Sequence, residues 1–131
     1  MYFSPILVVA GEPNSIFLEI YFKSIKKLKI KNPLILIASI KLVKLQMKKL
    51  KFSKKIKLLS SHQLSKYKLD NKCINLINVE YTQKQAFSKI SNKSNKYVEE
   101  CLNLLFQIIK KYKLKKFING PISKKYFLNK K

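Results

Sequence analysis

The chain has 131 residues, enough for one domain with a modest core, and no apolar run approaches the roughly 18 residues that a membrane span requires. Its formal net charge is +23, and its 29 basic residues are all lysines. The lysines are spread over every segment, whereas nucleic-acid-binding proteins gather basic residues in a patch and favour arginine for bidentate contacts. A/T-rich codons for Lys, Ile and Asn account for this composition, so we expect neither a nucleic-acid nor a membrane partner.

The N-terminus carries a short apolar segment, but no Lys or Arg precedes it. No small-residue cleavage site follows it, so the sequence does not predict a signal peptide. We therefore expect a cytoplasmic protein.

The first unit, Pro5 to Leu28, predicts a strand, a tight loop and a helix. Ile6 to Val9 is a continuous branched apolar run, typical of a strand buried on both faces of a parallel sheet. The loop from Gly11 to Ser15 ends the strand, and Asn14 or Ser15 can cap the following helix. The expected inner face of that helix consists of Phe17, Ile20, Tyr21, Ser24, Ile25 and Leu28.

A second strand and helix follow. Leu34 to Ala38 is another apolar run, and Ser39 can cap a helix that extends to about Lys51. The apolar stripe of this helix is expected to comprise Leu42, Val43, Leu45, Met47 and Leu50.

The middle of the chain is more polar. Ile56 to Leu59 predicts a short third strand, and Ser60 to Lys72 predicts a surface loop with one helical turn. Cys73 to Val79 alternates in part, which indicates a strand with one exposed face, at the sheet edge or crossing to another part of the molecule. Glu80 to Asn92 is a second long polar connection, and long structureless loops are commonly functional.

The pattern from about Ser94 to Lys113 predicts a long helix, with glutamates toward its start and lysines toward its end. Its apolar positions are Tyr97, Val98, Cys101, Leu104, Leu105, Ile108, Ile109 and Tyr112. A short strand from Phe117 to Asn119 ends in Gly120 and Pro121, and a last helix carrying Tyr126, Phe127 and Leu128 is expected from about Ser123. Because the chain stops just after this unit begins, we expect it to be part of a longer domain.

Motifs for catalysis and metal binding are missing. With two glycines the sequence has no G-x-G-x-x-G and no P-loop, and its six acidic residues do not pair with His or Cys at metal spacing. Cys73 and Cys101 are expected to be buried small hydrophobes, and His62 a solvated loop residue. We therefore assign no catalytic residue and no metal ligand.

Two strand-to-helix loops remain as candidates, Gly11 to Ser15 and Asn119 to Lys124. Each places backbone N–H groups where a phosphate or carboxylate could bind, and the second adds a lysine. Gly and Pro serve tight turns equally well. Residue chemistry leaves both interpretations open.

Two stretches carry a family resemblance. Pro5 to Ile20, PILVVAGEPNSIFLEI, resembles the opening of the 4-hydroxythreonine-4-phosphate dehydrogenases, the PdxA family of vitamin B6 synthesis, whose pattern is close to P-I-x-I-T-x-G-E-P-A-G-I-G-P-E-I. Asn92 to Lys131 is similar to a later family stretch in which an N-A-x-Y-V-x-E-x-L helix leads to a strand and T-G-P-[IV]-x-K. The resemblance runs the length of this chain but covers well under half of the family's usual length.

The chain departs from the family pattern at two places. Asn14 to Leu18 lacks two family glycines, and Asn119 replaces the usual Thr before Gly-Pro. The family's substrate-binding His-Thr pair, its metal-binding histidines and most nicotinamide contacts come beyond the equivalent of Lys131, so none is assigned here.

The resemblance implies an α/β fold: a three-layer α/β/α arrangement with a mostly parallel sheet of the isocitrate/isopropylmalate dehydrogenase type. Residues 1–131 would form a single α/β domain, the N-terminal part of a longer enzyme. The full-length family implies a homodimer that uses NAD or NADP and a divalent metal to oxidise 4-hydroxythreonine 4-phosphate, followed by decarboxylation. Here Glu12, Gly120, Pro121 and Lys124 would line one wall of the substrate cleft.

This chain alone is expected to bind no cofactor and to have no dehydrogenase activity, since the family's metal ligands lie outside it. Two alternatives remain open. One is a small Lys-rich module that binds nucleic acid or an acidic partner, and the other is a gene remnant or truncated product without independent function.

Overall fold

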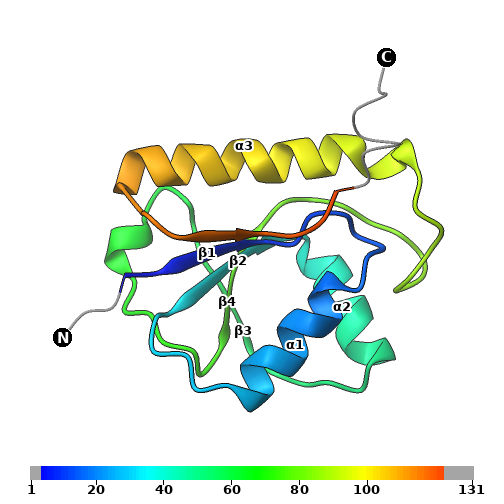
Figure 1. Cartoon of the computed structure of the whole chain (residues 1–131), viewed down its shortest axis with the longest axis horizontal. Helices are drawn as coiled ribbons and strands as arrows, with labels where there is room; N and C mark the ends of the chain where they lie inside the picture. The colour runs from blue at the N-terminus through cyan, green and yellow to red at the C-terminus, as the bar shows by residue number, and fades with distance from the viewer. Residues whose placement is uncertain (1–3, 123–131) are drawn as a thin grey trace.

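A computed structural model describes residues 4–122 and contains a five-stranded, all-parallel β-sheet (Figure 1). The strands follow the order β3-β4-β2-β1-β5 across the sheet. Their bounds are Ile6–Val9 for β1, Leu34–Ala38 for β2, Ile56–Leu58 for β3, Ile74–Asn78 for β4 and Phe117–Asn119 for β5. The predicted α/β class and parallel sheet are confirmed.

Three α-helices cover the two faces of the sheet. Helices α1 (Phe17–Lys27) and α2 (Ile40–Lys49) pack on one face, and the long α3 (Asn95–Tyr112) packs on the other (Figure 1). Two short 3-10 helices, η1 (Leu64–Lys66) and η2 (Asn92–Ser94), interrupt the long connections. The described part therefore has three layers, as predicted.

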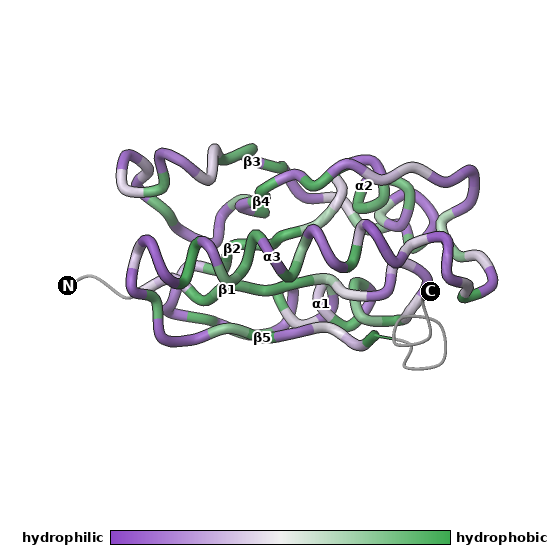
Figure 2. Tube along the Cα trace, turned by 90° about the horizontal axis from the view of Figure 1, so that it is seen from above, coloured by the Kyte–Doolittle hydropathy of each residue, from purple (hydrophilic) through white to green (hydrophobic). Residues whose placement is uncertain are grey.

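The core is split by the sheet because successive side chains of a strand point to opposite faces. In β1, Leu7 and Val9 pack toward α3, whereas Val8 packs toward α1 and α2, as does Ala10 just after the strand. Every residue of β2 is buried, as expected for a central strand covered on both faces. In Figure 2 the hydropathy colouring shows the same arrangement: β1 and β2 are predominantly green at the centre of the molecule.

Strand β4 lies inside the sheet, so the prediction of an edge or crossing strand was wrong. It pairs with β2 on one side and with β3 on the other. The polar residue behind the apparent alternation, Asn75, is 1% exposed. Its side-chain amide donates to the carbonyl oxygens of Leu34 at 3.0 Å and Asp70 at 2.8 Å, so hydrogen bonding, not solvent, satisfies this buried group.

Helix α1 begins later than predicted, and its inner face matches the predicted one only in part: Phe17, Tyr21 and Ile25 pack inward as expected. Its N-cap position is Ile16, which makes no side-chain capping bond, although the Ser15 hydroxyl accepts from the N–H of Phe17 at 3.2 Å. Ile20 and Leu28, both expected inside, are 51% and 61% exposed. The buried residues are Leu18, Tyr21 and Phe22, because packing against α2 and the sheet selects the stripe through these positions.

The other helices agree more closely with the prediction. Ser39 caps α2 by accepting from the N–H of Leu42 at 3.3 Å, and α3 runs nearly as expected. Gln46, on the polar side of the predicted stripe of α2, is fully buried instead. The helix predicted from about Ser123, with Tyr126, Phe127 and Leu128, lies outside the described residues.

Candidate functional site

The carboxyl ends of the parallel strands meet at one edge of the sheet, where open α/β proteins usually bind ligands. The two loops identified from sequence come together at this edge. The N–H of Gly120 donates to the carbonyl oxygen of Val9 at 2.7 Å, and the N–H of Glu12 donates to the carbonyl oxygen of Pro121 at 2.7 Å. The loop after β1 and the segment after β5 are thus joined backbone to backbone.

Glycine is required on both sides of this junction. Gly11 has φ +74°, and a Cβ there would lie 2.5 Å from the carbonyl oxygen of Pro121. A Cβ on Gly120 would overlap the carbonyl oxygen of Ala10. Two backbones approach here more closely than any side chain allows, so both glycines have a structural role in shaping the edge.

Glu12 is buried, with 6% of its surface exposed, and connects three segments. One carboxylate oxygen accepts from the N–H of Asn14 at 3.2 Å, and the other accepts from the hydroxyl of Ser94 at 3.1 Å. Ser94 is the N-cap residue of α3, so the carboxylate lies near the positive end of that helix. Glu12 therefore holds the loop after β1 against the start of α3.

Asn14 organises the opening above this carboxylate. Its side-chain oxygen accepts from the amide of Gln83 at 2.7 Å and from the N–H of Ser88 at 2.8 Å. These bonds tie the loop after β1 to the long connection between β4 and α3 and bound a groove of about 740 Å³. This polar groove is lined by Asn14, Tyr81, Thr82, Gln83, Ser88, Lys89, Ile90, Ser91 and Lys93.

Two stacked tyrosines pack at this edge of the sheet. The rings of Tyr81 and Tyr97 stack with centroids 4.8 Å apart, and the hydroxyl of Tyr97 accepts from the N–H of Ser39 at 2.9 Å. Burial raises the pKa of Tyr97 well above its usual value, and burial together with the charge of Glu12 raises the pKa of Tyr81. Both phenols stay neutral near pH 7, so neither serves as a general base there.

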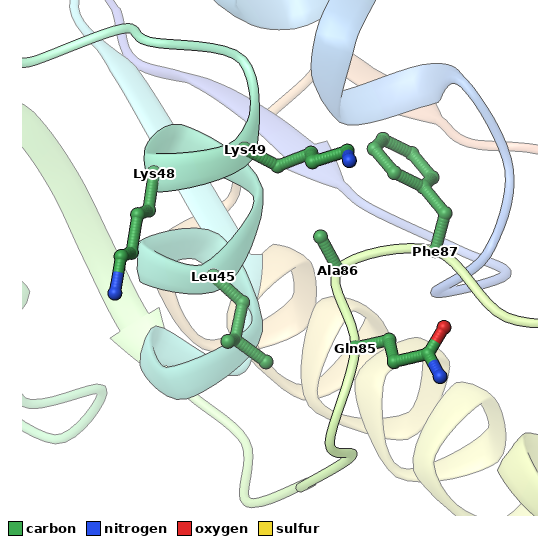
Figure 3. A pocket seen from close by; sticks show the side chains of 6 residues that line it. All are labelled: Leu45, Lys48, Lys49, Gln85, Ala86 and Phe87. Carbon is green, nitrogen blue, oxygen red and sulfur yellow. The ribbon is translucent and has the colours of Figure 1, made fainter.

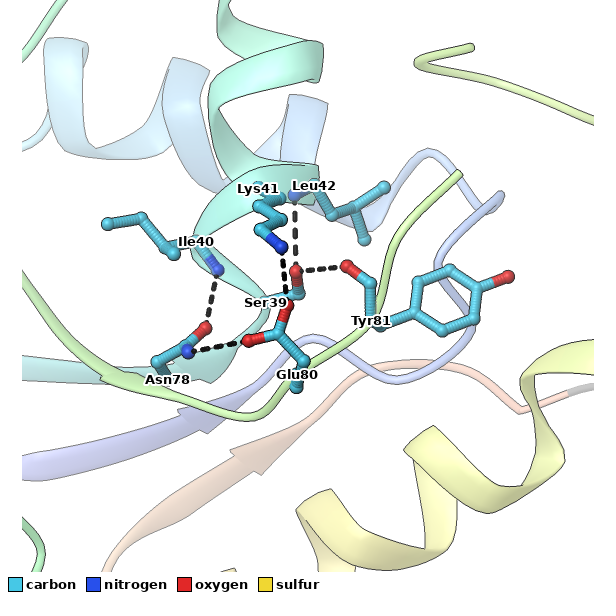
Figure 4. A network of polar contacts seen from close by, with 7 residues as sticks. All are labelled: Ser39, Ile40, Lys41, Leu42, Asn78, Glu80 and Tyr81. Carbon is cyan, nitrogen blue, oxygen red and sulfur yellow. Dashed lines mark hydrogen bonds and ion pairs between the residues drawn. The ribbon is translucent and has the colours of Figure 1, made fainter. Parts of the chain in front are cut away.

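A polar network fastens the end of β4 to the start of α2 (Figure 4). The hydroxyl of Ser39 donates to the carbonyl oxygen of Tyr81 at 2.6 Å, and the N–H of Ile40 donates to the side-chain oxygen of Asn78 at 2.9 Å. Lys41 and Glu80 form an ion pair at 2.9 Å, and Lys41 lowers the pKa of the Glu80 carboxyl. These bonds fix the end of β4, from which the segment that lines the polar groove continues.

A second hollow lies between α2 and the same long connection (Figure 3). It measures about 490 Å³ and is lined by Leu45, Lys48, Lys49, Gln85, Ala86 and Phe87. The buried amide of Gln46 donates to the carbonyl oxygens of Pro13 at 2.9 Å and Ala86 at 3.4 Å. It therefore joins the loop after β1 to the long connection between β4 and α3. Gln46 contributes to the shape of both hollows without lining either.

Of the four residues predicted to line the cleft, the structure brings Glu12, Gly120 and Pro121 together. Lys124 lies outside the described residues. Glu12 supports the polar groove from beneath and does not line it. Sequence reasoning placed Asn14 in a candidate loop and offered it as a helix cap, but it did not single out the side chain of Asn14 for the site. It assigned no site role to Gln83, Lys89 or Lys93, although these three fall in or beside the long polar connection whose length indicated a function.

The described part of the chain, residues 4–122, contains His, Cys, Asp and Glu side chains of the types that bind metals, including a buried cysteine. Within residues 4–122, no three His, Cys, Asp or Glu side chains lie close enough together to hold a metal ion. Cys101 is fully buried, and burial raises the pKa of its thiol to about 12, so it stays protonated and unreactive. No helix of this part is long and apolar enough to cross a bilayer.

The fold places the chain among known structures, although no protein-family model matches the sequence and no curated protein matches it. The crystal structure of a 4-hydroxythreonine-4-phosphate dehydrogenase from Burkholderia phymatum matches with a TM-score of 0.83 at 13% sequence identity. The fold is that of the matched part of this dehydrogenase. The match covers 98% of this chain and 39% of the dehydrogenase, and it confirms the resemblance seen in the sequence.

Two further 4-hydroxythreonine-4-phosphate dehydrogenases agree. A putative enzyme from Salmonella typhimurium matches with a TM-score of 0.81 at 15% identity, and the enzyme from Klebsiella pneumoniae matches with a TM-score of 0.81 at 13% identity. Each match covers 96% of this chain and 39% of the other. The chain thus spans about two fifths of the length of the solved dehydrogenases that it matches.

Proposed function

We propose that this chain is the N-terminal part of an NAD(P)- and divalent-metal-dependent dehydrogenase that oxidises 4-hydroxythreonine 4-phosphate in vitamin B6 synthesis. The observation that carries the proposal is the fold match over nearly the whole chain, with TM-scores of 0.81 to 0.83. Two sequence stretches with family patterns support it, because Pro5 to Ile20 and the segment around Gly120 form the same edge of the sheet.

In this proposal the chain supplies one wall of the substrate cleft. The polar groove offers lysine ammonium groups on Lys89 and Lys93 and hydroxyls on Thr82, Ser88 and Ser91, which suit a phosphorylated polar substrate. Glu12 and the junction at Gly120 and Pro121 hold this wall in shape.

By the family resemblance, the nicotinamide cofactor and the metal would be held mainly by other parts of a longer polypeptide. A divalent metal supplies Lewis-acid chemistry in such enzymes by polarising a hydroxyl or carbonyl oxygen. This chain's own residues would bind and orient substrate, so we expect no turnover by the chain alone. The homodimer implied by the family remains part of the same proposal.

The test starts with the intact mass of the native protein in its source cell. A mass more than twice that of this 15.4 kDa chain is expected, and that polypeptide should reduce NAD or NADP with 4-hydroxythreonine 4-phosphate. A native mass matching 131 residues would contradict an active dehydrogenase.

A substitution then tests the proposed wall in the native-length enzyme. Lys124→Ala should lower kcat/KM for the phosphorylated substrate by about tenfold or more, because a charge-assisted phosphate contact is lost. Lys110→Ala, an exposed lysine on α3, is the matched control and should leave kcat/KM within about twofold. An unchanged kcat/KM for Lys124→Ala would remove that lysine from the cleft.

A further inference from the structure

A further cleft, lined by four lysines, lies at the opposite edge of the sheet from the polar groove. It measures about 440 Å³ and is bordered by the end of α1, the segment after α2 and the turn before β4. Its lining residues are Ile25, Lys26, Lys51, Phe52, Ser53, Lys54 and Lys72, and we call it the basic cleft. The residues of the polar groove follow the strands, whereas Lys54 and Lys72 precede β3 and β4, so the two sites are separate.

Parallel pairing of β3 with β4 places the segments that carry Lys54 and Lys72 at the same edge of the sheet. Ile56 of β3 is in register with Ile74 of β4, and the N–H of Ile74 donates to the carbonyl oxygen of Lys55 at 2.8 Å. Lys54 and Lys72 each lie two residues before this pair, in the segments that lead into the neighbouring strands β3 and β4. Lys54 is half-buried, although lysines are mostly exposed.

The charge in the basic cleft is weakly compensated. Its four lysines form no ion pair within residues 4–122, and no acidic residue lines it. Asp70 is the acid nearest in sequence, and its carboxylate accepts from the N–H of Lys72 at 2.9 Å. The carboxyl ends of α1 and α2 add about half a negative charge each. Set against four ammonium groups, Asp70 and the two helix ends leave an excess of about two positive charges.

Compensation of the helix dipole does not explain all four lysines of the basic cleft. A lysine in a last helical turn, such as Lys26, complements the helix dipole, but Lys54 and Lys72 stand at strand starts. Near the end of α2, the carbonyl oxygens of Gln46, Met47 and Lys48 already accept backbone N–H groups, among them that of Phe52, which donates to Met47 at 3.0 Å. Compensation of helix ends therefore does not explain Lys54 and Lys72.

Two of the lining residues, Ile25 and Phe52, are apolar and pack against the core. The ring of Phe52 stacks on Phe22 with centroids 5.0 Å apart, and Ile25 lies beside them. The volume falls within the range of small-molecule sites, about 300–1,000 Å³.

We propose that the basic cleft binds a compact ligand with two or more linked phosphate groups, such as inorganic triphosphate or the triphosphate moiety of a nucleotide. Lysine binds phosphate as a point charge, and several lysines on separate segments can contact successive phosphates at once. This site is independent of the dehydrogenase proposal.

Binding of inorganic triphosphate to the full chain, measured by isothermal titration calorimetry at low salt, tests the proposal. Lys54→Gln with Lys72→Gln should raise the Kd by about tenfold or more, since two charged contacts are lost. The matched control, Lys96→Gln with Lys110→Gln, removes the same charge from exposed positions on α3, across the sheet. Its Kd should stay within about twofold of the parent chain.

An equal loss of affinity in both double variants would overturn the proposal, because overall charge and not the cleft would then attract the anion. Absence of binding to the parent chain would also overturn it. Thermal melting by circular dichroism confirms that the variants fold, and Lys26→Gln with Lys51→Gln provides a second cleft variant at exposed positions. Titration with adenosine triphosphate separates the sources: a Kd well below that of triphosphate assigns the site to a nucleotide, and an equal Kd assigns it to the phosphate chain.

Discussion

Glu12 lies beneath the polar groove and not in its wall. Its carboxylate accepts from the backbone of Asn14 and from the hydroxyl of Ser94, which are distant in sequence. A buried carboxylate with satisfied hydrogen bonds is a structural link between segments, and a cleft position alone does not make it a ligand-binding group. At the residue scale, the proposed site therefore depends on supporting contacts as much as on the residues that line it.

A double-mutant cycle tests this link. Glu12→Ala should lower the free energy of unfolding by about 2–4 kcal/mol, because the buried hydroxyl of Ser94 and the partly buried N–H of Asn14 lose their acceptor. Ser94→Ala in the Glu12→Ala background should cost less than in the parent chain, with a coupling energy of about 1 kcal/mol. Urea unfolding followed by circular dichroism gives both quantities.

Glu19→Ala is the control for that cycle, since it removes a carboxylate that forms an ion pair with the exposed Lys23 on the same helix. It should cost less than about 0.5 kcal/mol. Additive effects of Glu12→Ala and Ser94→Ala would show that the two side chains do not interact.

At the scale of elements, neighbours in the sheet determined what periodicity left undecided. β4 is an interior strand because β3 and β2 flank it, and Asn75 is accommodated there by two carbonyl oxygens. Helix α1 exposes Ile20 because α2 and the sheet contact a neighbouring stripe. In contrast, the 18-residue helix α3 ran close to its predicted bounds, since its apolar spacing is long and regular.

The end of α3 offers a test at this scale. Its C-cap residue, Lys113, has φ 54° and ψ 41°, a left-handed conformation that disfavours residues with a Cβ. Lys113→Gly should raise the free energy of unfolding by about 0.5–1 kcal/mol, measured by urea unfolding. Lys110→Gly, inside the same helix, should lower it by about 1 kcal/mol, and the opposite signs distinguish capping from a general effect of glycine.

At the scale of the whole molecule, the large net positive charge affects the stability of the fold. The chain carries a formal charge of +23, and only three ion pairs occur between side chains in residues 4–122. Self-repulsion of this excess opposes the compact state, and salt screens it over about 10 Å at 0.1 M ionic strength.

Added salt should therefore stabilise the fold. Raising sodium chloride from about 20 mM to about 300 mM should increase the Tm by about 3–6 °C, measured by circular dichroism. An unchanged or lower Tm would show that repulsion among the lysines contributes little to stability.

The sequence by itself determined the α/β class, the elements with strong periodicity and the two loops at Gly11 and Gly120, because apolar runs, helical spacing and Gly-Pro turns are local properties. It also indicated the long polar connection whose residues line the polar groove. Strand order, the stripe buried by α1 and the partners of Glu12 and Asn14 came only from the tertiary structure. The presence of Lys54 and Lys72 in one cleft did too, since all of these depend on contacts between segments far apart in the chain.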